Sequence, residues 1–252
     1  MILYATDYDG TVSPHTGEEL EKTIADWQAA GNLFVVVTGR PMASIRSTLL
    51  RQKFRPDYVV CDNGALVATS DYRIKWYRAL NPADIVKALE YLRDYVGDGP
   101  RIDAVEGHLS AYCVPDKLDV TDDGRGLVFG STVFGDVIEF CCIYKEKDVN
   151  LSMNEAVEKL TGGRLTGKSS SRMGSDYVAA GVSKAAGIKK LIEIAEIEPD
   201  KIIATGDAYN DIEMLVCPEI EGYVVENGLE SVKEQVGRTV ESPITLMRRY
   251  LN

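Results

Sequence analysis

The sequence contains little histidine, and its two histidines, His15 and His108, lie far apart without the spacing of metal ligands. They therefore support neither a histidine zinc site nor a serine–histidine–aspartate triad. The five cysteines are an odd number and also lack metal-ligand spacing. We interpret them as reduced thiols in the core of a cytoplasmic protein.

Positive charge is also scarce, since 28 lysines and arginines face 39 aspartates and glutamates and leave a formal net charge of −11. This balance argues against nucleic acid or an anionic membrane as a partner, because both attract basic surfaces. No apolar run reaches the ~18 residues that would predict a membrane span. The first residues carry no basic region before Asp7, so we expect no signal peptide.

What the sequence does contain, over its first third, is a regular alternation of apolar, β-branched runs with helical patterns. Short apolar runs bounded by turn formers predict buried strands, and the first helix between them would begin at a capping box of Thr16 and Glu19. This βαβαβ order predicts an α/β fold with a doubly wound, mostly parallel sheet and a Rossmann-like core. The predicted strands are 2–6, 33–37 and 58–61, and the rhythm resumes with a helix at 184–195 and a strand at 201–204.

Residues 81–180 follow a different pattern, with two predicted helices among short strand-like runs. Within them, residues 118–135 are rich in aspartate and glycine and predict an exposed loop. We therefore predict an α+β domain over residues 81–180. It would be inserted into a core domain built from residues 1–80 and 181–252.

Carboxylates follow two of the predicted strands. Asp7 and Asp9 stand one residue apart after the strand at 2–6, and carboxylates this close resist joint ionisation unless a bound cation removes the cost. Asp207 follows the strand at 201–204 and would reach the same edge, because open α/β sheets bind ligands beyond the carboxyl ends of their strands. Three carboxylates at one edge predict a hard-oxygen site suited to Mg²⁺.

Three further residues could hold a phosphoryl anion. Thr38 and Gly39 come directly after the second strand, where a hydroxyl and a free amide can bind a phosphate oxygen. Lys184 opens a helix, and a fixed ammonium would stabilise a phosphoryl group beside three carboxylates. Each motif alone is more often an ordinary turn or helix end, but their convergence on one sheet edge favours a site.

Residues 162–169 match the G-x-x-x-x-G-K-[ST] pattern of a nucleotide-binding P-loop. That loop requires a strand before it and a helix after it. Here the preceding segment has a helical pattern, and the segment after Ser169 does not begin a helix. We interpret the match as a helix end that runs into a strand of the inserted domain.

The motifs combine into a pattern that resembles the four motifs of the haloacid dehalogenase-like hydrolase superfamily. They lie at residues 7–11, 38–40, 184 and 206–211. Residues 62–65, 181–184 and 208–215 further resemble the Cof-type sugar-phosphatase branch, which carries an α/β cap at the position of the inserted domain. The resemblance implies a Mg²⁺-dependent phosphatase of small phosphomonoesters, with sugar phosphates as the expected substrates, and we expect a monomer.

The resemblance also implies roles for the acidic residues. Asp7 would attack phosphorus and form an aspartyl-phosphate, which splits one displacement into two easier ones. Mg²⁺ would be held by the Asp7 carboxylate, the Asp9 backbone carbonyl and Asp207. The Asp9 side chain would protonate the leaving alkoxide and then take a proton from the attacking water. Asp211 would orient Lys184 or a metal-bound water.

The groups that bind the substrate are implied in the same way. The residues that would hold the transferring phosphoryl group are Thr38, Gly39, Lys184 and Asn210. The cap would close over the site and contact the leaving group, and we place those contacts on a polar strand from Lys168 to Arg172.

Three other functions stay open. Related phosphomutases share the four motifs, and they differ in whether a sugar hydroxyl or water attacks the intermediate. A catalytically silent binding or regulatory module is a second alternative, although such proteins typically lose a residue that this sequence retains. A kinase built on residues 162–169 is the weakest.

Overall fold

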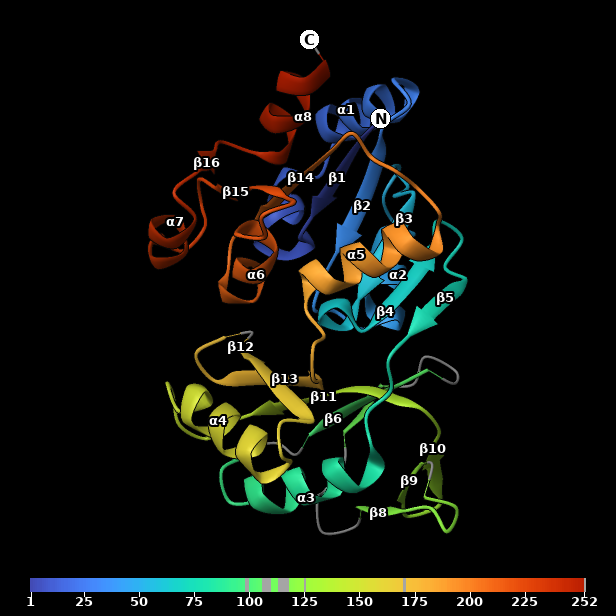
Figure 1. The fold of residues 1–252 in the computed structure, drawn as a ribbon, viewed down its shortest axis with the longest axis vertical. Helices are drawn as coiled ribbons and strands as arrows, with labels where there is room; N and C mark the ends of the chain where they lie inside the picture. The colour runs from blue at the N-terminus through green and yellow to red at the C-terminus, as the bar shows by residue number, and fades with distance from the viewer. Residues whose placement is uncertain (98–99, 106–109, 113–117, 125, 170, 252) are drawn as a thin grey trace. The chain divides into compact units, whose positions relative to one another are not determined.

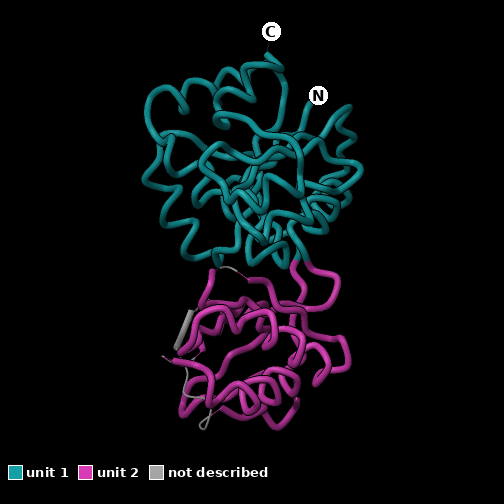
Figure 2. Tube along the Cα trace, turned by 90° about the vertical axis from the view of Figure 1, so that its left-hand side faces the viewer, with its two compact units in different colours: residues 1–76, 183–252 teal, residues 77–182 magenta. Residues whose placement is uncertain are grey.

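The computed structural model describes residues 1–97, 100–105, 110–112, 118–124, 126–169 and 171–251. The chain forms two compact units, Met1–Trp76 with Ser183–Asn252, and Tyr77–Val182 (Figure 2). The second unit is therefore an insertion in the first. His108 and Cys113 lie outside the described residues, and the other four cysteines are buried free thiols.

The first unit is built on one eight-stranded sheet (Figure 1). Its order is β16-β15-β14-β1-β2-β3-β4-β5, and the pairs from β16 to β3 are parallel whereas β3 and β4 are antiparallel. The predicted doubly wound, mostly parallel sheet is thus confirmed. The strands are β1 (Ile2–Thr6), β2 (Leu33–Val37), β3 (Tyr58–Cys61), β4 (Leu66–Thr69), β5 (Ile74–Tyr77), β14 (Lys201–Gly206), β15 (Glu221–Val225) and β16 (Thr239–Val240).

Both faces of this sheet are covered by helices, as the side chains of β1 show. Leu3 belongs to a core cluster that also contains Ile188 of α5 and Met214 of α6. Tyr4 points to the other face, where its ring meets Trp27 of α1 at a centroid distance of 6.0 Å. A central strand buried on both faces reads as a continuous apolar run, which explains the pattern of β1 and β2. The helices are α1 (Glu18–Ala29), α2 (Met42–Leu49), α5 (Lys184–Ile194), α6 (Ile212–Leu215), α7 (Glu230–Val236) and α8 (Pro243–Leu251).

The predicted start of α1 is wrong in its details. The N-cap is Gly17, and no side chain caps the helix. The Thr16 hydroxyl instead donates to the Ser13 carbonyl at 3.3 Å. Three acidic residues in the first turn, among them Glu18 and Glu19, favour the helix start through its dipole.

The described residues of the second unit form two antiparallel sheets and two helices. The larger sheet has the order β12-β13-β11-β6-β7, and the smaller has the order β10-β9-β8. Helix α4 packs on β12 and contacts α3. The bounds are α3 (Pro82–Leu92), β6 (Arg101–Ala104), β7 (Ser110–Tyr112), β8 (Leu118–Val120), β9 (Leu127–Phe129), β10 (Thr132–Phe134), β11 (Val137–Ile143), α4 (Asn150–Leu160), β12 (Leu165–Ser169) and β13 (Gly174–Ala179).

The prediction of an exposed loop at 118–135 is wrong, because this stretch forms the smaller sheet. Leu118, Leu127 and Phe134 are buried and give the three strands an inward face. Most of the aspartates and glycines that suggested a loop lie between the strands, where Gly124 and Gly130 have φ values of +71° and +60°, whereas Asp119 lies within β8. Turn residues between strands only three residues long dominate the local composition.

The P-loop-like residues 162–169 come after helix α4, and the last five of them form strand β12. This confirms the interpretation of a helix end that runs into a strand, since a P-loop needs the reverse order.

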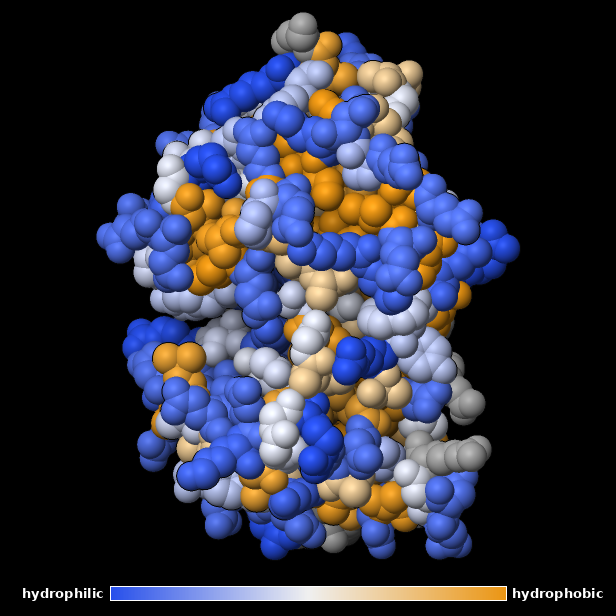
Figure 3. Space-filling view, viewed as in Figure 1, coloured by the Kyte–Doolittle hydropathy of each residue, from blue (hydrophilic) through white to orange (hydrophobic). Residues whose placement is uncertain are grey.

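Hydrophilic residues cover much of the face shown in Figure 3, with hydrophobic patches over the first unit. Within the described part of the chain, no helix has the length and apolar character to cross a membrane.

Candidate active site

The carboxyl ends of four strands in the first unit carry the polar motifs. Strands β14, β1, β2 and β3 lie next to one another in parallel, so their ends share one edge of the sheet (Figure 1). Asp7 follows β1, Thr38 follows β2, and Asp207 follows β14. A turn at Asp62–Gly64 follows β3, and Lys184 lies at the first position of α5.

A buried lysine joins two of the carboxylates. Lys184 Nζ donates to Asp7 Oδ1 and to Asp211 Oδ1, each at 2.6 Å, and its side chain is 0% exposed. Burial opposes the ammonium charge, but the Asp211 and Asp7 carboxylates outweigh it and raise the pKa of Lys184 above its usual value. Lys184 is therefore a fixed cation between two acidic groups.

The acidic cluster carries more negative charge than Lys184 balances. Carboxylate oxygens of Asp7, Asp207 and Asp211 lie within 4.8 Å of one another. Burial raises the pKa of Asp7 well above its usual range; Lys184 acts in the opposite direction, whereas Asp211 and Asp207 add to the rise. Burial and the Asp211 carboxylate raise the pKa of Asp207 to about 6. A second cation would relieve this excess, so the donor set fits a divalent ion held by hard oxygen ligands.

The hydrogen bonds of Asp211 leave Asp7 and Asp207 as the carboxylates of the cluster that could hold a metal ion. Asp211 Oδ1 accepts from Lys184, and Oδ2 accepts from the backbone amides of Asp207 and Ala208 at 2.9 and 3.0 Å. Both oxygens of Asp211 are thus engaged, and the residue orients Lys184 and the turn that carries Asp207.

Asp207 is positioned by the motif that follows Asp7. Thr11 Oγ1 donates to Asp207 Oδ1 at 2.9 Å. Gly10 has φ +74°, and a Cβ there would lie 2.4 Å from Asp207 Oδ2. Both the left-handed backbone and the close approach require glycine. We did not assign Thr11 from the sequence, although its place directly after Asp-x-Asp-Gly was the available signal.

Thr38, Gly39 and Asn210 meet through a residue that the sequence analysis left unassigned. Asn63 Oδ1 accepts from Asn210 Nδ2 at 3.2 Å, and a Cβ on Gly39 would lie 3.0 Å from the same oxygen. The backbone N–H of Asn63 in turn donates to the backbone carbonyl of Thr38 at 3.1 Å. Asn63 has φ +53°, so the asparagine–glycine turn after β3 was the signal that could have found it.

Asp9 stands apart from the acidic cluster in its contacts. Its side chain is 50% exposed and forms an ion pair with Arg40. Arg40 Nε donates to Asp9 Oδ2 at 2.6 Å. The motif after β1 and the motif after β2 are therefore linked by a pair of charges as well as by their place on the sheet.

The two residues predicted to contact a leaving group lie in the second unit, and they do not share a strand. Lys168 lies on β12 opposite Asp176, whereas β12 ends at Ser169. Arg172 falls in the bend after it and donates through Nε to Asp148 Oδ1 at 2.8 Å. The prediction of one polar strand from Lys168 to Arg172 is wrong, because the chain already turns toward β13.

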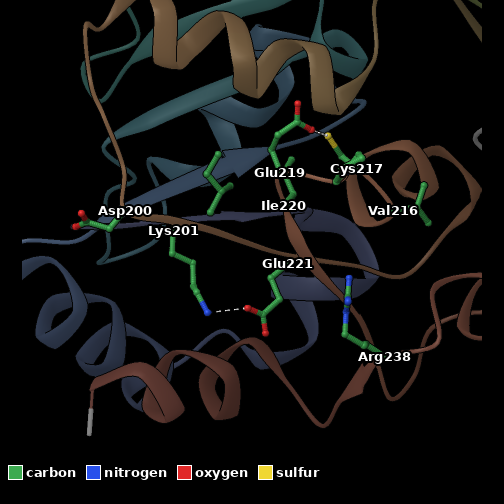
Figure 4. A pocket seen from close by; sticks show the side chains of 10 residues that line it. Asp200, Lys201, Val216, Cys217, Glu219, Ile220, Glu221 and Arg238 are labelled. Carbon is green, nitrogen blue, oxygen red and sulfur yellow. Dashed lines mark hydrogen bonds and ion pairs between the residues drawn. The ribbon is translucent and has the colours of Figure 1, made fainter.

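A separate hollow of about 620 Å³ lies at the opposite edge of the same sheet, by the first residues of β14 and β15 (Figure 4). Four of its polar lining groups form two hydrogen-bonded pairs. Lys201 Nζ contacts Glu221 Oε2 at 2.8 Å, and the Cys217 thiol donates to Glu219 at 3.0 Å. None of the polar motif residues lines this hollow.

Comparisons with known proteins agree with this geometry. The family model described as haloacid dehalogenase-like hydrolase matches residues 4–109 and 132–243. A Streptococcus pyogenes protein named as a bifunctional phosphatase/peptidyl-prolyl cis-trans isomerase is 26% identical over 209 residues. The match covers 78% of this chain and 41% of that protein, so the chain spans about two fifths of this relative's length.

Solved structures share the fold over nearly the whole chain. A haloacid dehalogenase-like hydrolase from B. subtilis has a TM-score of 0.76 at 19% identity and covers 98% of this chain and 99% of its own. A subclass IIB sugar phosphatase of the same superfamily has a TM-score of 0.67 at 20% identity, with coverage of 99% and 97%.

Proposed function

Because the chain belongs to the haloacid dehalogenase-like hydrolase family, we propose that it is a Mg²⁺-dependent phosphatase that hydrolyses small phosphomonoesters through a phosphorylated Asp7. The observation that carries this proposal is the buried Lys184 between Asp7 and Asp211, with Asp207 beside them at the carboxyl edge of the sheet. An unsatisfied acidic cluster next to one fixed cation suits a site that binds a metal ion and a phosphoryl group together.

In the proposed reaction Asp7 attacks phosphorus, the bond to the leaving alkoxide breaks, and water later hydrolyses the aspartyl-phosphate. Lys184 keeps Asp7 in place through its hydrogen bond and balances the negative charge of Asp211. Asp9 donates a proton to the leaving oxygen in the first step and accepts one from water in the second.

The Asp7 and Asp207 carboxylates, together with the Asp9 backbone carbonyl, would hold the Mg²⁺ ion. When bound, the ion supplies positive charge to the phosphoryl oxygens and to the nucleophile. Thr11 fixes one oxygen of Asp207, and Asp211 fixes the turn on which Asp207 stands.

The transferring group would be held by Thr38, Gly39, Lys184 and Asn210. Asn63 supports this binding, because its side chain accepts from Asn210 and lies beside the position that a Cβ on residue 39 would take. A glycine at position 39 keeps that backbone close to Asn63, and a Cβ would push the two apart.

We further propose sugar phosphates as the substrate class and the second unit, Tyr77–Val182, as the cap that contacts the leaving group. The likeness to a sugar phosphatase supports this view. On the larger sheet of this unit, β-pairing places Lys168 opposite Asp176, Asp176 opposite Cys141, and Cys141 opposite Arg101. Directly opposed side chains share one face, so this row carries charges suited to polyhydroxylated or anionic groups. Lys168 and Arg172 remain candidate contacts, and this row adds Arg101, which itself pairs with Asp103 at 2.9 Å.

Phosphate release with and without Mg²⁺ tests the proposed function. We expect release from several hexose or pentose phosphates in the presence of Mg²⁺ and none after EDTA treatment, with activity restored by added Mg²⁺. The assay should include nucleotides and phosphoglycolate as competing substrate classes. Turnover that is insensitive to EDTA, or conversion of a sugar phosphate to its isomer without phosphate release, would contradict the proposal; the latter would indicate a phosphomutase.

The Asp9→Asn variant tests the proton-transfer role. We expect a loss of ~10²–10⁴-fold in the first step for alkyl phosphates, because the leaving alkoxide needs a proton. p-Nitrophenyl phosphate should lose much less in that step, since its leaving group departs as a stable anion. An equal loss for both substrates in single-turnover experiments would reject the role of Asp9.

A further inference from the structure

The Asp9 carboxylate is held on both of its oxygens by one side chain. Arg40 Nε donates to Asp9 Oδ2 at 2.6 Å, and Arg40 Nη2 donates to Asp9 Oδ1 at 2.5 Å. Two parallel N–H···O bonds from a planar guanidinium fix the plane of a carboxylate as well as its position. Arg40 therefore determines where the carboxylate of Asp9 points.

Arg40 is itself fixed on its remaining sides. Its Nη1 donates to Thr48 Oγ1 at 2.9 Å, and that hydroxyl donates to the Ser44 carbonyl of the same helix, α2, at 3.1 Å. The guanidinium carbon also lies 5.3 Å from the centroid of the Tyr8 ring, within the range of a cation–π contact. Tyr8, which stands between Asp7 and Asp9 in the sequence, is buried. Its fixed ring therefore gives the Arg40 guanidinium a rigid surface to pack on.

Asp9 needs this support because neither burial of its side chain nor the neighbouring backbone fixes the rotamer of its carboxylate. The side chain is half exposed, and the next residue, Gly10, has left-handed backbone geometry that only a flexible residue adopts readily. An exposed aspartate on such a turn would otherwise sample several rotamers. Proton transfer requires the carboxylate within hydrogen-bond reach of the reacting oxygen, so rotamer exchange would slow it.

We infer that Arg40 is a positioning residue for proton transfer by Asp9, an inference that rests on the proposed function. During the first step the protonated Asp9 gives its proton to the leaving oxygen as the P–O bond breaks, and its other oxygen stays on Arg40. In the second step the Asp9 carboxylate takes a proton from water as the new O–P bond forms, while the bond between phosphorus and Asp7 breaks and frees the Asp7 carboxylate. Arg40 keeps one side-chain oxygen of Asp9 in place in both steps, and its hydrogen bonds go to Asp9 and Thr48 rather than to the Asp7 and Asp207 carboxylates.

The Arg40→Ala variant tests this inference through the dependence on the leaving group. We expect the first step to slow by about 10²-fold for a hexose phosphate, the size of effect that a misplaced catalytic group produces. For p-nitrophenyl phosphate it should slow by only a few-fold, whereas hydrolysis of the phosphoenzyme should slow equally after either substrate. The KM of both substrates should change little, because Arg40 does not contact the transferring group.

Two further variants and a control sharpen the test. Arg40→Lys keeps a point charge without the fork and should restore part of the first step, and Thr48→Ala should show a smaller loss with the same preference for the activated substrate. The control is Arg51→Ala. Arg51 lies just after helix α2 and donates to Ser47, so this variant should behave as wild type. Thermal unfolding identifies any variant that is misfolded; if Arg40→Ala is, the other two carry the test.

Two outcomes would overturn the inference. One is an Arg40→Ala protein that loses both substrates equally or binds both more weakly, which would make Arg40 a phosphate ligand. The other is an Arg40→Ala protein with wild-type rates. Failure of the proposed function looks different, since the wild-type protein would then release no phosphate from any phosphomonoester, and both proposals would fall.

Discussion

The Asp7→Asn substitution is expected to reduce phosphate release by ~10⁴-fold or more, to the limit of detection. An amide is a far poorer nucleophile than a carboxylate and a poorer ligand for Mg²⁺. The protein should still fold, because burial already raises the pKa of Asp7, so a neutral side chain suits the position. The Asn oxygen can also still accept from Lys184. Steady-state rates with Mg²⁺ and a hexose phosphate measure the effect.

A matched control separates this loss from a general effect of removing a carboxylate. Asp26 is exposed on helix α1, and the Asp26→Asn variant should keep wild-type activity. The Asp7→Asn protein should also unfold at a temperature close to that of wild type. If it retained more than a small fraction of the activity, Asp7 would not be the nucleophile.

The second large effect is expected on stability, from Lys184→Met. The substitution removes the ammonium that joins Asp7 and Asp211 and leaves two carboxylates buried together without a cation. Removing one partner of a buried ion pair typically lowers the free energy of unfolding by about 3–5 kcal/mol. Urea unfolding without added metal measures this difference, and activity should be lost as well, because no fixed cation then faces the phosphoryl group.

Another lysine of the same helix serves as the control. Lys189 pairs with Glu219 on the surface, and exposed ion pairs add little to stability. Lys189→Met should therefore leave the free energy of unfolding nearly unchanged. Similar unfolding curves for Lys184→Met and Lys189→Met would show that the buried ion pairs of Lys184 do not stabilise the fold.

The convergence of the acidic motifs could be predicted from the sequence, because it follows from the rules of parallel sheets. Strand β1 ends directly before Asp7, and strand β14 ends directly before Asp207. Parallel neighbours end at one edge, so carboxylates that follow them must meet there. Lys184, directly after an N-cap serine, comes to the same edge because α5 begins beside it.

The sequence was least informative where local composition and burial disagree. Residues 118–135 look like a loop because glycines and aspartates fill the turns, yet Leu118, Leu127 and Phe134 make a small sheet. Thr16 and Glu19 likewise have the spacing of a capping box, but the chain turns at Gly17 and moves Thr16 away from the helix.

Contacts between distant residues could not be predicted either. Asn63 bonds Asn210 across 147 positions, and Arg40 bonds Asp9 across 31. No local pattern specifies such partners, since they depend on how two loops meet in space. The pairing of Arg172 with Asp148 across 24 positions is a further contact that its polar run did not indicate.

The most direct test of the account is to trap the phosphorylated protein. In the Asp9→Asn variant, p-nitrophenyl phosphate should still phosphorylate the protein, because its leaving group needs no proton, whereas hydrolysis of the intermediate should be slow. After Mg²⁺, substrate and an acid quench, peptide mass spectrometry should find one phosphoryl group, on the peptide that contains Asp7. A phosphoryl group on any other residue, or p-nitrophenol release by this variant without a protein-bound phosphoryl group, would contradict the account.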